Sequence, residues 1–176
     1  MQPEMLILGW GNPGRGDDGL GPEFVAAIET LGLPGIAVDS DYQLQVENAA
    51  DVARFRRVLF VDADRSGAEP FWLGRLRPDE RSLSFSTHSV APAAVLALAR
   101  DLFGAEPEAW IMGIRGYDFD EFLEQLSDRA RSNLDQAVES LKSAIQGDGL
   151  QAVEPRTAMK PITYDHEGGQ CQTTNP

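Results

Sequence analysis

Short apolar segments alternate with segments of helical period over most of this chain, and that alternation restricts the fold more than any other sequence feature. Short apolar runs bounded by turn residues are typical of buried strands, whereas apolar residues at every third or fourth position are typical of amphipathic helices. Strands that alternate with helices build a mostly parallel sheet covered on both faces. We therefore expect an α/β fold, a three-layer α/β/α sandwich with a mostly parallel, twisted sheet of about five strands.

The expected elements follow one another without an internal repeat. Strands are predicted at residues 5–9, 36–38, 58–61, 71–76 and 109–114, the fourth of them as an edge strand because apolar and polar residues alternate in it. Helices are predicted at residues 20–31, 46–55 and 89–102, with Ser89 as the N-cap of the third, and a last helix starts at Ser127. The core is expected to contain Leu6, Leu8, Leu59, Val61 and Met112.

A change of composition at Gly147 divides the chain into two parts. Residues 1–146 are long enough for one domain with a sizeable core. In residues 147–176 glycine, proline, threonine, glutamine and asparagine dominate, and no periodicity remains. We expect this second part to be a polar, flexible C-terminal tail.

Charge and composition exclude several classes of partner. The net charge of −13 opposes binding to nucleic acid or to an anionic membrane surface. No apolar run approaches the roughly 20 residues that span a bilayer, and the N-terminus lacks the basic leader and cleavage site of a signal peptide. Cys171 is the one cysteine, so an intrachain disulfide is impossible, which fits a reducing compartment. We expect a cytoplasmic protein with no nucleic-acid or membrane partner.

Acidic residues and one histidine stand where an α/β fold brings segments to one end of the sheet. Asp17 and Asp18 lie in the glycine-rich loop after the first expected strand, Asp62 ends the third, and His88 precedes a helix. Ligands of open α/β sheets bind beyond the carboxyl ends of the strands. The positive end of the helix would keep the imidazole neutral, the form that binds metals. These residues are either a metal site with open positions or turn, cap and surface residues.

The glycine-rich loop also matches a nucleotide-binding pattern. Residues 9–14 read Gly-x-Gly-x-x-Gly after a strand, the dinucleotide fingerprint. Asp17 and Asp18, however, occupy the place where a pyrophosphate needs positive potential. Asp39 and Asp41 are the only candidates for a ribose-binding acid, and neither stands clearly at the expected distance. The fingerprint is therefore a weak indication of dinucleotide binding.

Four segments, in order and spacing, resemble the hydrogenase maturation proteases. The first joins residues 6–12 to residues 16–21, which read Gly-Asp-Asp-Gly-Leu-Gly, and the second is the apolar run 58–63, which includes Asp62. The third is Thr87-His88 before an apolar helix, and the fourth is residues 113–117, where members of the family carry a strand and a variable specificity loop. The resemblance covers about residues 5–145.

The resemblance implies a functional site made of Asp18, Asp62 and His88, which would be both the catalytic residues and the metal ligands. Some members of the family carry glutamate at the position of Asp18, so the aspartate shortens the reach of this ligand. Residues 39–44 replace an Asp-Gly-Gly-Thr run that is frequent in the family, so no role carries over to Asp39.

The same resemblance implies the reaction. The family members are endopeptidases, classed here as aspartic-type hydrolases, that remove the C-terminal extension from the precursor of a [NiFe] hydrogenase large subunit after nickel has been installed. The precursor supplies the nickel, and no tightly bound cofactor of the protein's own is expected. The three ligands would sense the nickel, because only a metallated precursor supplies an ion that an open ligand set can complete.

Two other functions remain open on the sequence. Peptidyl-tRNA hydrolases can also open with a strand followed by Gly-x-Gly-Asn-Pro-Gly, but an Arg-His-Asn run should follow, and this chain has Asp17-Asp18-Gly19 instead. A pI near 4.4 also suits a tRNA substrate poorly. A non-catalytic maturation chaperone on the same fold would be favoured by loss of Asp18, Asp62 or His88, and all three are present.

Overall fold

A mixed sheet of five main strands forms the centre of the molecule. The computed structural model describes residues 4–79, 90–120, 122–147, 162–164 and 171–173. The main strands are β1 (Met5–Trp10), β2 (Ile36–Asp41), β3 (Arg57–Asp64), β4 (Phe71–Leu76) and β5 (Glu108–Arg115). They lie in the order β2-β1-β3-β5-β4, and every pair is parallel except β4 with β5. The mostly parallel sheet and the position of β4 at its edge are confirmed.

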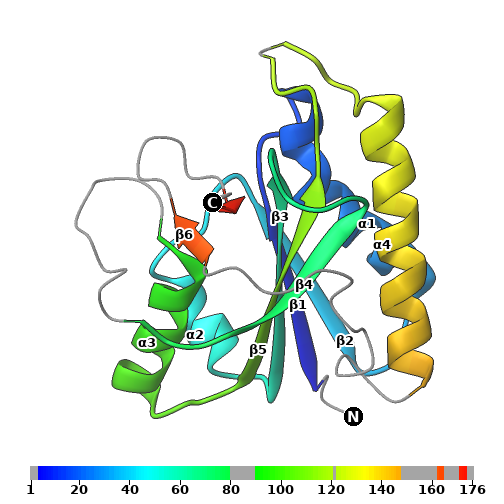
Figure 1. The fold of residues 1–176 in the computed structure, drawn as a ribbon. Coiled ribbons are helices and arrows are strands. Elements are labelled where there is room, and N and C mark those ends of the chain that lie inside the picture. Colours follow the sequence, from blue (N-terminus) through cyan, green and yellow to red (C-terminus); the bar gives the residue numbers. More distant parts are fainter. Residues whose placement is uncertain (1–3, 80–89, 121, 148–161, 165–170, 174–176) are drawn as a thin grey trace.

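Helices cover both faces of this sheet. Figure 1 shows α1 (Leu20–Leu31) and α4 (Asp128–Gln146) on one side, and α2 (Asn48–Val52) and α3 (Pro92–Phe103) on the other. The three-layer α/β/α sandwich is therefore confirmed. No helix in the described part of the chain is both long and apolar enough to cross a membrane.

The core divides into two layers because successive residues of a strand point to opposite faces of a sheet. The layer under α1 and α4 includes the strand residues Ile7, Leu59, Val61, Met112 and Ile114. The layer under α2 and α3 includes the strand residues Leu6, Leu8, Val58, Phe60 and Ile111. The five residues predicted for the core are all buried, none more than 4% exposed. Both faces of the central strands are covered, which explains their nearly continuous apolar runs.

Two expected boundaries differ from the structure at the end where ligands of such folds bind. β3 runs on through Asp62 to Asp64, so Asp62 lies inside the strand and not at its end. The third helix begins at Pro92 with Ala91 as its N-cap, so the prediction of Ser89 as the N-cap is wrong. Proline suits the first turn of a helix because its nitrogen has no hydrogen to leave unpaired, and Ala91 is already extended. The N-cap at Ser127 is confirmed, since its Oγ accepts from the Ala130 N–H at 3.3 Å.

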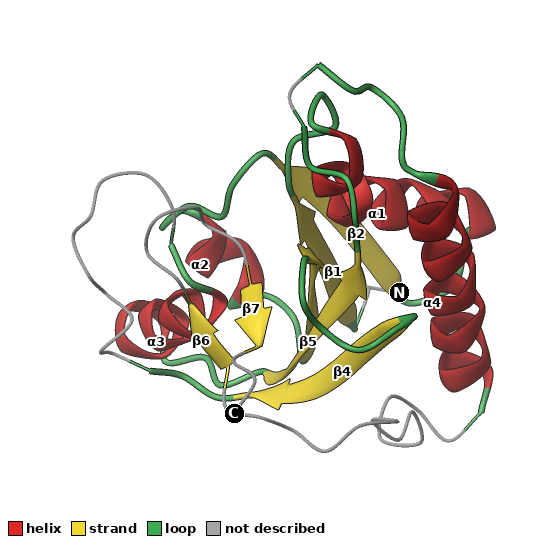
Figure 2. Ribbon diagram, turned by 45° about the horizontal axis from the view of Figure 1, so that its top comes forward, coloured by secondary structure: helices red, strands yellow, loops and turns green. Residues whose placement is uncertain are grey.

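The C-terminal region contributes two short strands that the sequence analysis does not predict. β6 (Ile162–Tyr164) pairs with β7 (Cys171–Thr173) in antiparallel fashion, and Figure 2 shows the two strands side by side. β7 also pairs with β3 at one position, Cys171 with Asp64. The other residues after Gly147 lie outside the described residues. The polar, flexible tail at 147–176 and the domain boundary before it stay predictions.

Candidate active site

A glycine-rich loop between β1 and α1 fixes the position of Asp18. The loop passes through a short 3-10 helix, η1 (Gly16–Gly19), which contacts β3. A side chain at Gly11 would put its Cβ 1.9 Å from the Asp18 carbonyl oxygen, and the φ of Gly11 is +138°, which also favours glycine. The Asp18 Oδ2 accepts from the Asn12 N–H at 3.0 Å, and the residue is only 8% exposed. Asp18 is therefore held by the backbone of its own loop.

Glycines also bring the start of α1 against the sheet. A Cβ at Gly9 would lie 2.5 Å from the Gly21 oxygen, and one at Gly21 would lie 2.3 Å from the Trp10 oxygen. Helix and strand backbones touch there, so the fingerprint glycines serve packing in this structure. The carboxylates that follow them, Asp17 and Asp18, are buried in the loop where a pyrophosphate would need positive potential. This arrangement gives dinucleotide binding no support.

Asp62 and Asp64 lie near the carboxyl end of β3 and are both buried. The Asp64 carboxylate accepts from the Ser66 N–H at 2.9 Å, the Gly67 N–H at 2.8 Å and the Trp72 indole. It thereby holds the turn from β3 to β4, a structural role. Gly113 leaves the space for this contact, because a Cβ there would lie 2.3 Å from the indole nitrogen.

The orientation of Asp62 is set by its place in β3. Side chains two residues apart share a face, so Asp62 points to the side of Phe60, the face covered by α2 and α3. Its register partner on β5 is Gly113, and its Oδ1 accepts from the Ala63 N–H at 2.8 Å. Asp18, in the loop that follows β1, and Asp62, in the neighbouring parallel strand β3, thus lie toward the same end of the sheet.

His88 lies outside the described residues, but the chain that follows it is anchored next to the same face. The Val90 N–H donates to the Leu44 oxygen at 3.2 Å, and Val90 packs against the core layer that contains Phe60. α3 then begins at Pro92. The described residues hold no group of three or more histidine, cysteine or acidic side chains that could bind a metal. The convergence of His88 with Asp18 and Asp62 stays a prediction.

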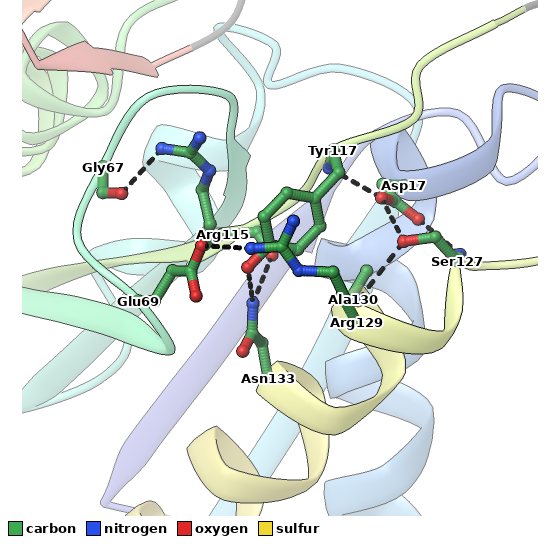
Figure 3. Close-up of polar contacts among 9 residues, drawn as sticks. All are labelled: Asp17, Gly67, Glu69, Arg115, Tyr117, Ser127, Arg129, Ala130 and Asn133. Carbon is green, nitrogen blue, oxygen red and sulfur yellow. Dashed lines mark hydrogen bonds and ion pairs between the residues drawn. The ribbon is translucent and has the colours of Figure 1, made fainter.

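Asp17 has a different role from Asp18, its neighbour in the chain. Its side chain is fully buried and accepts four hydrogen bonds, of which Figure 3 shows those from Tyr117 and Ser127. Oδ2 accepts from the Tyr117 N–H at 2.7 Å, the Asp118 N–H at 2.9 Å and the Ser127 Oγ at 2.8 Å, and Oδ1 accepts from the Ser127 N–H at 2.7 Å. All four donors belong to the crossover from β5 to α4, so Asp17 joins this crossover to the loop that carries Asp18.

A polar cluster on the other side of Tyr117 was missed by the sequence analysis. Asn133 donates through Nδ2 to the Tyr117 hydroxyl at 2.8 Å and to the Arg115 carbonyl at 2.9 Å (Figure 3). The Arg129 guanidinium lies 3.9 Å from the centre of the Tyr117 ring and bonds Glu69 at 2.8 Å. Burial raises the pKa of the Tyr117 hydroxyl, and the hydrogen bond with Asn133 acts in the opposite direction. Asn133 is buried on the inner face of α4. A polar residue among the apolar positions of this helix was the sequence feature that could have indicated the cluster.

The described part of the site offers oxygen ligands. Asp18 and Asp62 each present a buried carboxylate, the kind of group that binds divalent cations or polarises a water molecule. Asp64 and Asp17 are occupied by the turn and the crossover that they hold. Asp17 and Asp64 therefore build the loops around the site, whereas Asp18 and Asp62 are the two described carboxylates of the predicted site.

No family model matches this chain. A curated protein of Methanocaldococcus jannaschii, provisionally named a hydrogenase maturation protease, is 28% identical over 155 residues, which cover 81% of this chain and 97% of that protein. The similarity thus extends over nearly all of that relative and is not confined to the glycine-rich loop.

Solved structures of hydrogenase maturation proteases share the fold of this chain. The hydrogenase maturating endopeptidase HybD from E. coli superposes with a TM-score of 0.63 at 22% identity, covering 85% of this chain and 94% of HybD. The [NiFe] hydrogenase maturation protease HycI from Thermococcus kodakarensis gives a TM-score of 0.62 at 20% identity, covering 83% and 94%. These likenesses show a shared fold. Together with the sequence relative, they confirm that the chain resembles the hydrogenase maturation proteases, as its four sequence segments indicate.

Proposed function

We propose that this protein is an endopeptidase that removes the C-terminal extension from the nickel-loaded precursor of a [NiFe] hydrogenase large subunit in the cytoplasm. The observation that carries the proposal is the position of Asp18 and Asp62, two buried carboxylates at one end of neighbouring parallel strands. Support comes from the fold, which is that of maturation endopeptidases, and from the similarity to a relative named for this activity.

In this proposal Asp18, Asp62 and His88 contact the nickel of the precursor, which is part of the substrate. Two carboxylates and one imidazole hold a divalent ion only modestly, so ligands from the precursor must complete its coordination. A precursor without nickel offers nothing for the three side chains to share. Recognition of the metal would thus select the precursor that is ready for cleavage.

The hydrolytic step is assigned to the aspartic class. The sequence contains no Gly-x-Ser-x-Gly elbow for a serine nucleophile, and Cys171 lies in the C-terminal region. The two described site residues are carboxylates, which can take a proton from an attacking water molecule when they lie within hydrogen-bond reach of it.

Replacement of Asp62 by asparagine tests the proposal. The amide keeps the shape and one oxygen but loses the charge that attracts a divalent ion, so Asp62→Asn should abolish shortening of the precursor, and His88→Ala should act similarly. Asp135→Asn, at an exposed carboxylate of α4, is the matched control and should cleave normally. Mass spectrometry of the precursor is the readout, and circular dichroism checks the fold.

Two results would contradict the proposal. If a well-folded Asp62→Asn protein cleaves the precursor at the normal rate, the Asp62 carboxylate has no role in cleavage. A wild-type protein that binds the nickel-loaded precursor without shortening it would instead support the chaperone alternative.

A further inference from the structure

We propose that Phe122, in the crossover from β5 to α4, is a docking residue that binds an apolar site with basic surroundings on the large-subunit precursor. The inference rests on the proposed function and adds the surface of this protein that holds the precursor. It concerns a residue outside the trio Asp18, Asp62 and His88.

Phe122 combines two features that folding does not explain. Its side chain is 91% exposed, the most of any large apolar residue that the structure describes. Its φ is +70°, in the left-handed region that glycine adopts most easily and that a bulky residue rarely adopts. Glycine would suit this backbone better, and a polar residue would suit the exposure. An aromatic ring at such a position indicates contact with another molecule.

A second phenylalanine in the same crossover shows the contrast. Phe119 is 8% exposed and belongs to the core layer under α1 and α4, with the Arg65 guanidinium 4.0 Å from its ring centre. Phe119 therefore anchors the crossover to the core. Phe122, three positions later, faces solvent, and Leu123 beside it is also 39% exposed. The two residues form a small apolar surface.

The backbone around Phe122 is tied to the loop that carries Asp18. The Phe122 N–H donates to the Gly14 oxygen at 3.0 Å, and the Leu123 oxygen accepts from the Gly16 N–H at 2.6 Å. The Asp17 carboxylate holds both ends of the crossover through Tyr117, Asp118 and Ser127. These hydrogen bonds hold the backbone of Phe122 at a defined place relative to the loop that carries Asp18, which reduces the ordering that binding would need.

The charges beside Phe122 indicate the chemistry of its partner. Asp120, Glu124 and Asp128 flank it in the sequence and are exposed. The nearest arginines along α4 are paired: Arg129 with Glu69 at 2.8 Å, and Arg131 with Glu23 at 3.2 Å. Arg15, whose backbone forms a bridge with Leu123, is partly buried, so the three exposed carboxylates outnumber the cations beside the apolar pair. Such a surface fits an apolar pocket that is bordered by lysine or arginine.

The test uses the full chain and the nickel-loaded large-subunit precursor encoded in the same genome. Phe122→Ala and Phe122→Gly are compared with Phe103→Ala, which removes another exposed phenylalanine, 53% exposed at the end of α3. Calorimetric Kd, KM for cleavage and melting temperature are measured for each protein. Both Phe122 variants should raise Kd and KM by about tenfold or more, as loss of a central apolar anchor does. Phe103→Ala should bind and cleave like the wild type.

The melting temperature separates docking from a structural role. Phe122→Gly should melt at the same or a higher temperature than the wild type while it binds less well, because glycine relieves the backbone at positive φ. Wild-type affinity should also fall as salt is raised.

Unchanged Kd and KM in the Phe122 variants, with normal cleavage by the wild type, would overturn the docking role and leave the proposed function standing. A wild type that neither binds nor cleaves would overturn the proposed function itself. Salt-independent binding would overturn the basic character assigned to the partner.

Discussion

Replacing Asp17 by asparagine tests whether the crossover from β5 to α4 depends on one buried carboxylate. The two oxygens of Asp17 accept from four donors, and among these only the Ser127 hydroxyl can also accept. An asparagine must direct its amide hydrogens at one of these donor groups. The least crowded choice places the amide nitrogen opposite the Ser127 N–H, which then loses its partner.

The cost follows from the number and kind of hydrogen bonds affected. A buried N–H without a partner costs about 1–3 kcal/mol, and bonds to a charged acceptor are stronger than those to a neutral amide. We therefore expect Asp17→Asn to lower the free energy of unfolding by roughly 2–4 kcal/mol. For a chain of this length that corresponds to a fall in melting temperature of roughly 5–15 °C.

Urea denaturation followed by tryptophan fluorescence, together with calorimetry, measures this loss. Asp120→Asn is the matched control, because Asp120 is an exposed aspartate in the same crossover, and the free energy of unfolding should change by no more than about 0.5 kcal/mol. If Asp17→Asn also stays within about 0.5 kcal/mol of the wild type, the four hydrogen bonds contribute little and the reasoning is refuted.

Two further substitutions address the loop and the polar cluster. Gly11→Ala should cost roughly 3 kcal/mol or more, because its Cβ would meet the Asp18 oxygen at 1.9 Å, whereas Gly104→Ala, at φ +64° with open space, should cost about 1 kcal/mol. Similar losses of stability in Gly11→Ala and Gly104→Ala would show that the close contact with the Asp18 oxygen adds no cost of its own. Tyr117→Phe should cost about 1 kcal/mol at neutral pH, because the hydrogen bond from Asn133 is lost. Burial raises the pKa of Tyr117 above 10.0, so the unfolded chain loses this proton first and wild-type stability falls as the pH rises past about 10. The free energies of unfolding of the wild type and of Tyr117→Phe, measured by urea denaturation, should therefore converge as the pH rises past about 10. A difference that stays constant with pH would contradict the role given to the Tyr117 hydroxyl.

Much of the fold could be predicted because its signals are local. The alternation of residues 71–76 identified the edge strand β4, and Ser127 marked the start of α4 through its cap. Asp62 was expected to end a strand because charged residues usually do. Instead β3 continues to Asp64, since register pairing with Gly113, Ile114 and Arg115 of β5 extends the strand.

The site was predictable only in part. Asp18 and Asp62 could be placed at one end of the sheet because consecutive parallel strands have their carboxyl ends on the same side. The hydrogen-bond partners of Asp17 could not be predicted, because nothing in the sequence indicates that Asp17 contacts Ser127, 110 positions away. The contacts of the segment around Phe122 could not be predicted either, because its hydrogen bonds join Phe122 to Gly14 and Leu123 to Gly16, residues far away in the sequence.

Nickel dependence tests the central claim most directly. Purified protein is incubated with nickel-loaded precursor, with nickel-free precursor and with an unrelated peptide, and each product is weighed by mass spectrometry, while the metal content of the protein alone is measured. The account predicts little stoichiometric metal in the purified protein and a mass loss, equal to the C-terminal extension, in the nickel-loaded precursor alone. Tightly bound zinc, together with chelator-sensitive cleavage of nickel-free precursor, would contradict it and identify a conventional metalloprotease on this fold.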